Sequence, residues 1–173
     1  MQLLKIYSKL FSFYGKQNWW PVSDGSSLKA TYKPRKKLTS IQKFEICVGA
    51  ILTQNTAWQN VEKALLNLKK AKAMNAEKIA KIPKQKLAKL IAPSGFFNQK
   101  SAYLKNFCKH LLENYSADID KFFFKPLAEL RHELLSIKGI GNETADSILL
   151  YAAEKPIFVI DSYTKRIFGR LGI

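Results

Sequence analysis

Apolar residues recur at the spacing of an amphipathic helix along most of the chain. Residues 2–14 show the pattern at the N-terminus, with its apolar positions at Leu3, Leu4, Tyr7, Leu10, Phe11 and Tyr14. The same spacing recurs over 41–55, 58–68 and 98–115. Pro83 separates two short apolar segments within 79–91, because proline cannot continue a helix. These periodicities predict an all-α fold, a bundle of many helices.

A glycine-rich turn separates two further helical runs near the C-terminus. Pro126 suits the first turn of the earlier helix, and Gly139-Ile140-Gly141 follows it. Glycine permits the positive φ of a tight turn, so we expect a helix, a hairpin and a second helix that starts near Asn142. The first N–H groups of that helix have no intrahelical partner, which suits a phosphate oxygen.

One carboxylate follows this hairpin at a short distance. Asp161 comes twenty residues after Gly141, directly behind the apolar run 157–160, and it opens another helical pattern. A carboxylate can stabilise a cation-like sugar and activate water. Alternatively, Asp161 only caps the helix that follows. A phosphate-binding turn at a fixed distance from a carboxylate favours chemistry on a nucleic-acid strand.

The charge distribution favours a polyanionic partner. The 173 residues include 29 basic and 13 acidic side chains, a net charge of +16. Residues 126–173 are neutral, so the excess lies in 1–125, and 63–89 is its most basic block. A solvated lysine-rich surface is the alternative explanation. No apolar run approaches the length of a membrane span, and the N-terminus lacks a signal-peptide pattern.

The hairpin and its surroundings resemble the helix-hairpin-helix/Gly-Pro-Asp superfamily of base-excision DNA glycosylases, to which endonuclease III belongs. The resemblance rests on IKGIG at 137–141, on Asp161 and on ILTQNT at 51–56. It implies an endonuclease III-like fold and catalysis by Asp161. Bifunctional members carry an imine-forming lysine where this chain has Glu143, and a carboxylate cannot form an imine. The resemblance therefore implies a monofunctional enzyme.

The tryptophans narrow the resemblance to the 3-methyladenine DNA glycosylase III branch. Trp19-Trp20-Pro21 and the segment that ends at Trp58 carry this likeness. The resemblance implies that Trp58, with Trp19 or Trp20, sandwiches a flipped, positively charged purine. Simple core packing is the alternative for all three indoles.

The resemblance also implies a set of DNA contacts. Gln54 would enter the gap left by the flipped nucleotide, Phe96 or Phe97 would wedge into the base stack, and Lys100 would bind a phosphate. The remaining expected contacts are Asn55, Lys138, Gly139, Gly141, Asn142 and Thr144. The alternatives are a capped turn at 53–56 and buried phenylalanines at the start of a helix.

No cofactor is expected for catalysis. The backbone carbonyls of Leu135, Ile137 and Ile140 resemble the superfamily's structural K⁺ or Na⁺ site. Cys47 and Cys108 lie in apolar helical patterns, so we expect buried free thiols. Two cysteines cannot supply the four ligands of an iron–sulfur cluster, so none is expected in this chain. The lack of a disulfide pattern fits a reducing cytoplasm, and we expect a nucleoid-associated monomer.

Three regions are expected. Residues 1–40 join the N-terminal segment of a second helical domain to a basic insertion at 22–40, which could touch phosphates or be a solvated loop. Residues 41–155 form the helix-hairpin-helix domain, and 156–173 hold the catalytic Asp segment. The resemblance implies several further helices beyond this point, so we expect that C-terminal helices are missing from this chain and that helix 2–14 has exposed apolar surface.

The sequence therefore predicts a monofunctional DNA glycosylase that acts on duplex DNA with a damaged base, an alkylated purine such as 3-methyladenine. One alternative is a glycosylase and AP lyase of endonuclease III type that acts on oxidised pyrimidines. The other is an inactive helix-hairpin-helix DNA-binding protein.

Overall fold

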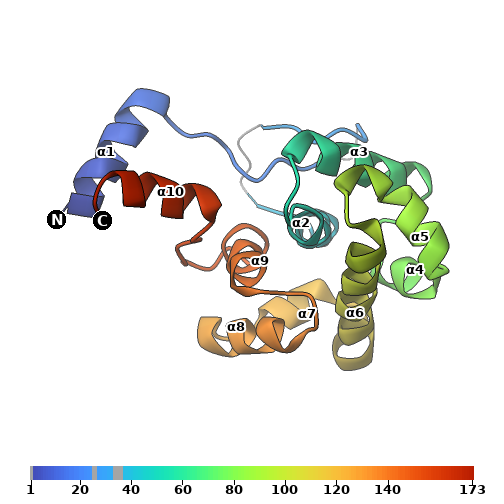
Figure 1. Ribbon diagram of the computed structural model, residues 1–173. Helices are drawn as coiled ribbons and strands as arrows, with labels where there is room; N and C mark the ends of the chain where they lie inside the picture. Colours follow the sequence, from blue (N-terminus) through green and yellow to red (C-terminus); the bar gives the residue numbers. More distant parts are fainter. Residues whose placement is uncertain (1, 25–26, 33–36) are drawn as a thin grey trace.

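The computed structural model describes residues 2–24, 27–32 and 37–173, and the regular elements in these ranges are helices joined by loops (Figure 1). The α-helices are α1 (Gln2–Tyr14), α2 (Ser40–Leu52), α3 (Trp58–Lys70), α4 (Ala76–Lys81), α5 (Lys84–Leu90), α6 (Phe97–Tyr115), α7 (Ile119–Phe123), α8 (Leu127–Ser136), α9 (Asn142–Ser147) and α10 (Ser162–Arg170). A 3₁₀ turn, η1 (Ala92–Ser94), precedes α6, and a π-helical turn, η2 (Ile148–Ala152), continues α9. The predicted all-α class is confirmed.

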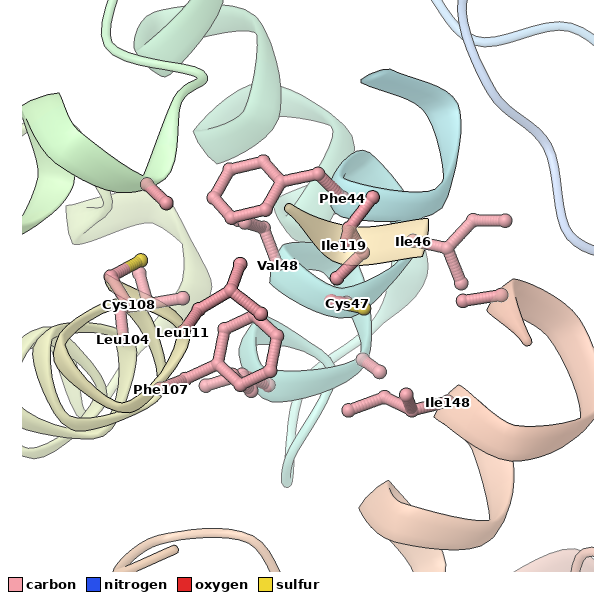
Figure 2. Close-up of a cluster of buried hydrophobic side chains, with 14 of the residues drawn as sticks. Phe44, Ile46, Cys47, Val48, Leu104, Phe107, Cys108, Leu111, Ile119 and Ile148 are labelled. Atoms are coloured by element: carbon pink, nitrogen blue, oxygen red, sulfur yellow. The ribbon is translucent and has the colours of Figure 1, made fainter. Parts of the chain in front are cut away.

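Helix α2 is the centre of the core. Its residues from Phe44 to Leu52 are all buried, as expected for a helix that is apolar on every side. Figure 2 shows α2 between α6, which contributes Phe107 and Leu111, and the η2 turn, which contributes Ile148. Since α2 ends at the cleft described below, this packing fixes the position of the turn that follows it.

The predicted helix boundaries hold to within a few residues. Helix α1 spans the predicted 2–14, and α6 begins one residue before the predicted 98. The helix predicted over 41–55 ends earlier, at Leu52. Asn55 adopts a left-handed conformation with φ of 51°, which a helix cannot include, and asparagine tolerates this region better than most residues.

Both cysteines lie in the core. Cys47 and Cys108 are buried free thiols, as the apolar pattern predicted. Burial raises the pKa of each thiol well above its usual range, so both stay protonated. Neither sulfur is placed for chemistry in the cleft.

Part of the basic insertion at 22–40 packs on the helical domain. Residues 25–26 and 33–36 lie outside the described residues. Val22 is buried and forms an isolated antiparallel bridge with Thr31. The buried Glu45 carboxylate accepts hydrogen bonds from the Ser23 hydroxyl at 2.6 Å and from Lys69 at 2.6 Å. The insertion is therefore anchored at both α2 and α3.

Replacing Glu45 with alanine should destabilise the fold by about 3 kcal/mol, because it leaves the largely buried Lys69 ammonium without its counter-charge. Urea unfolding of the variant measures this loss. The exposed pair Lys109–Glu113 serves as the control, and Lys109→Ala should change the free energy of unfolding by less than about 0.5 kcal/mol. Equal effects of the two substitutions would refute the anchoring role of Glu45.

The two ends of the described chain present apolar surface. Figure 1 shows α1 and α10 projecting away from the helices around α2. The expectation of exposed apolar surface on α1 is confirmed; the exposed large side chains of α1 are Leu3, Leu4, Tyr7, Leu10, Phe11, Phe13 and Tyr14. No helix in the described ranges is long and apolar enough to cross a membrane.

Candidate active-site cleft

A cleft of about 1290 Å³ lies between the turn after α2, the hairpin before α9 and the start of α10. The segments that contribute most of its lining are the tryptophan pair at 19–20, residues 53–58, the hairpin at 139–144 and the stretch 157–164, and the η2 turn adds Leu150 and Tyr151. The structure thus brings most of the predicted site residues to one cavity. Phe96, Phe97, Lys100 and Lys138 are not among its lining residues.

The hairpin requires glycine at its first position. Gly139 has φ of +105°, and a Cβ added there would lie 2.1 Å from the Tyr103 ring of α6. Asn106, also on α6, donates a hydrogen bond to the Lys138 carbonyl at 2.9 Å. The hairpin is therefore held against α6 by packing and by a backbone contact.

The second glycine of the hairpin, Gly141, differs from Gly139 in its backbone conformation. Glycine permits positive φ at both positions, but only Gly139 uses it, because Gly141 has φ of −94°, which any residue adopts. Gly141 is the N-cap of α9, and a Cβ there would meet nothing within 4 Å. The backbone at Gly141 is therefore open to an approaching group.

Asp161 is both a helix cap and a cleft residue. Its Oδ1 accepts hydrogen bonds from the Thr164 N–H and the Thr164 hydroxyl, each at 2.7 Å. Its Oδ2 receives no hydrogen bond from any residue in the described ranges. The capping alternative is therefore correct, but it uses only one oxygen and leaves the other available in the cleft.

Glu143 and Tyr151 share the cleft with the Asp161 carboxylate and lie within reach of its charge. Burial and the charge of Asp161 raise the pKa of both side chains, Glu143 and Tyr151. Both line the cleft. Apolar periodicity did not point to Tyr151, because this residue lies on the η2 turn, whose π geometry shifts the helical register.

The three tryptophans form one cluster. The ring centroids of Trp19 and Trp58 are 5.0 Å apart at 64°, and those of Trp20 and Trp58 are 5.3 Å apart at 89°. Trp20 is 4% exposed and packs on Gly49, whereas Trp19 is 39% exposed. A base held between two rings needs them roughly 7 Å apart and parallel. The predicted sandwich is therefore absent from this arrangement, and Trp19 is the indole that offers an accessible face.

Gln54 bonds to the hairpin. Its Nε2 donates to the Gly139 carbonyl at 2.9 Å and to the Thr144 hydroxyl at 3.1 Å. Thr144 is buried. Asn55, the residue after Gln54, is exposed. Entry of Gln54 into a DNA gap would require this amide to leave both partners.

The phenylalanine loop lies at the start of α6. Phe96 is 64% exposed and Phe97 is 40% exposed. Gly95 and Phe96 both have positive φ, at 68° and 43°. Neither ring is part of the core, so burial at a helix start, the alternative reading, does not describe them.

Lys100 is buried and does not face solvent. We expected it to bind phosphate, but it is 2% exposed. Its Nζ donates to the Leu52 carbonyl at 2.8 Å and to the Ser94 carbonyl at 2.6 Å. An ammonium group that is buried against two carbonyls cannot reach a phosphate.

Burial lowers the pKa of Lys100 to about 8. A lysine in the unfolded chain keeps its proton to about pH 10.4, so between these values the unfolded state binds more protons and stability rises with pH. From about pH 7 to about pH 10, the free energy of unfolding of the wild type should therefore gain about 2 kcal/mol relative to Lys100→Met. Urea titrations of both proteins at each pH test this, and a constant gap would contradict it.

Arg131 of α8 steadies the first turn of α9. Its guanidinium donates to Asp146 at 2.7 Å and to the side-chain oxygen of Asn142 at 3.2 Å. Lys138, by contrast, is exposed in the hairpin turn. Of the two residues predicted to contact DNA, Asn142 is therefore held by Arg131, whereas Lys138 is exposed to solvent.

The expected K⁺ or Na⁺ site involves the backbone carbonyls of Leu135, Ile137 and Ile140. Ile137 accepts a hydrogen bond from the Ile140 N–H at 3.0 Å. Within the described ranges, nothing outside the helices donates to the carbonyls of Leu135 or Ile140. Carbonyl oxygens that accept no hydrogen bond can coordinate K⁺ or Na⁺, and we propose such a site at these carbonyls.

The chain matches a known protein family. The model of the HhH-GPD superfamily of base excision DNA repair proteins matches residues 48–173. This chain therefore belongs to that superfamily.

Individual relatives agree with the assignment. The protein named "Putative DNA repair glycosylase MJ1434" from Methanocaldococcus jannaschii is 46% identical over 176 residues, 99% of this chain and 70% of its own length. Endonuclease III of Thermotoga maritima is 29% identical over 129 residues, 75% of this chain and 56% of its own length.

Two solved structures share the fold. H. pylori 3-methyladenine DNA glycosylase (MagIII) bound to 1,N6-ethenoadenine superposes with a TM-score of 0.76 at 35% identity, over 99% of this chain and 73% of its own. A non-covalent endonuclease III–DNA complex gives a TM-score of 0.76 at 19% identity, over 99% of this chain and 68% of its own, which supports the endonuclease III-like fold alone.

Proposed function

We propose that this protein is a monofunctional DNA glycosylase that hydrolyses the bond between deoxyribose and a damaged, alkylated purine. The observation that carries the proposal is the free Oδ2 of Asp161 in a cleft that Trp19 and Tyr151 also line. Glu143 stands in the same cleft, at the position where the lyases of the superfamily have lysine.

The chemistry follows from these groups. The bond between C1′ and the base nitrogen breaks with its electron pair leaving on the base, and positive charge develops on the sugar. Asp161 stabilises that charge and accepts a proton from the water that attacks C1′. A base that is already cationic departs as a neutral molecule, so no general acid has to protonate it. The products are the free base and an abasic site.

Recognition rests on stacking. A cationic purine gains attraction from the electron-rich face of an indole, and Trp19 exposes such a face at the cleft. The hairpin N–H groups behind Gly141, with a K⁺ or Na⁺ at the carbonyls of residues 135–140, would hold a phosphate of the same strand. The name of the H. pylori relative, a 3-methyladenine glycosylase, supports this choice of lesion.

Incubation with methylated duplex DNA tests the proposal. Chromatography should detect free 3-methyladenine, and the strand should stay intact until alkali cleaves the abasic site. Borohydride should trap no protein–DNA adduct. An adduct together with release of oxidised pyrimidines would establish the endonuclease III-type alternative. DNA binding with no base release would establish an inactive binding protein.

A further inference from the structure

Lys100 is buried where three elements meet. It lies in the first turn of α6, and its ammonium group bonds to the last residue of α2, Leu52, and to the last residue of η1, Ser94. Carbonyls at the C-terminal end of a helix carry partial negative charge and lack intrahelical partners. Among the described residues these two carbonyls are the partners of the charge, and no carboxylate forms an ion pair with it.

Each carbonyl immediately precedes a loop for which we expect a contact with DNA. Leu52 is followed by the turn that carries Gln54, and Ser94 is followed by Gly95 and Phe96. Both loops contain non-glycine residues with positive φ, Asn55 at 51° and Phe96 at 43°. Such conformations persist only where the surroundings hold them.

Helix α6 also holds the third loop, the hairpin. Tyr103 packs against Gly139, and Asn106 binds the Lys138 carbonyl. The hairpin in turn binds Gln54 through the Gly139 carbonyl. Lys100 is thus the direct link between the Gln54 turn and the phenylalanine loop, and α6 connects that pair to the hairpin.

We propose that Lys100 is a positioning residue that fixes the Gln54 turn and the Phe96–Phe97 loop relative to each other, so that both enter the DNA around a flipped nucleotide at once. This inference rests on the proposed function and on the roles that the family resemblance implies for Gln54 and the phenylalanines at the strands around the damaged base. Lys100 acts through the two backbone carbonyls and touches neither base nor phosphate.

The test uses insertion itself as the readout. A duplex carries an abasic-site analogue with 2-aminopurine opposite it, and the fluorescence of this base rises when side chains enter the gap and unstack it. Wild-type protein at saturation should raise the fluorescence. Lys100→Met should bind the duplex with a smaller rise at saturation, and Lys100→Arg should restore part of the signal because arginine retains several N–H donors.

Lys105→Met is the matched control. Lys105 lies on the same helix and donates to one backbone carbonyl, that of Ala80 at 2.6 Å, outside both loops. Its substitution should leave the fluorescence rise at the wild-type value. An equal loss in Lys105→Met and Lys100→Met would show a general packing effect and overturn the proposal.

Activity gives a second, separate measurement. Misplaced loops should lower the rate of base release from duplex DNA by roughly tenfold to 100-fold in Lys100→Met. A wild-type fluorescence rise in Lys100→Met overturns the positioning role even if base release is confirmed. Conversely, a reduced rise in a protein whose wild type releases no base supports the positioning role and refutes the enzymatic proposal.

Discussion

Asp161→Asn should lower the rate of base release by roughly 100-fold to 1,000-fold, the usual cost of removing one group that stabilises charge in a transition state. The substitution keeps the fold, because asparagine caps helices as well as aspartate does. The amide oxygen can still accept the Thr164 N–H and hydroxyl that Oδ1 now accepts. Single-turnover base release from methylated duplex DNA measures the effect.

Asp118→Asn provides the matched control. Asp118 caps α7 by accepting the N–H groups of Asp120 and Lys121, and it does not line the cleft. The same change of charge should leave base release unaltered there. If both variants lost activity equally, the effect would lie in net charge or capping, and Asp161 would lose its catalytic assignment.

Gly139→Ala should destabilise the protein by more than about 3 kcal/mol, the upper range for a strained backbone conformation alone. The new methyl group meets two separate obstacles. It requires an L-residue at φ of +105°, and it places a carbon 2.1 Å from the Tyr103 ring, so the hairpin must move away from α6. Urea unfolding gives the loss, and DNA binding should weaken with it because the hairpin is displaced.

Gly141→Ala is the control for Gly139→Ala, because it adds the same methyl group to the hairpin without a strained φ or a close contact. Gly141 has ordinary φ and open space around its Cα, so alanine should change stability by no more than about 0.5 kcal/mol. A stability loss at Gly141 as large as that at Gly139 would show that the described hairpin is incorrect.

The sequence predicted the helices and the hairpin well for a local reason. Apolar periodicity and turn residues act over a few positions, so helix 2–14 and the turn at Gly139 could be read directly from them. Most of the residues that the family resemblance named, in turn, line the cleft. These features depend little on which distant segments pack together.

The main differences at the site arise from features that apolar periodicity does not show. Lys100 looked like a solvent-exposed cation after a loop, and only the ends of α2 and η1, folded around it, make it a buried link. The expected tryptophan sandwich is absent from this arrangement because Trp20 fills the space over Gly49 and the three rings pack on one another. Tyr151 was missed because a π-helical turn redirects an apolar-looking segment to the cleft.

The most direct test of catalysis by Asp161 uses one substrate, duplex DNA that contains methylated purines. Wild-type protein and its Asp161→Asn variant are incubated with this DNA in parallel, with and without borohydride. We expect free 3-methyladenine from the wild type, far slower release from the variant, and no covalent adduct. Release at equal rates from both proteins, or a trapped adduct, would contradict a glycosylase that works through Asp161 alone.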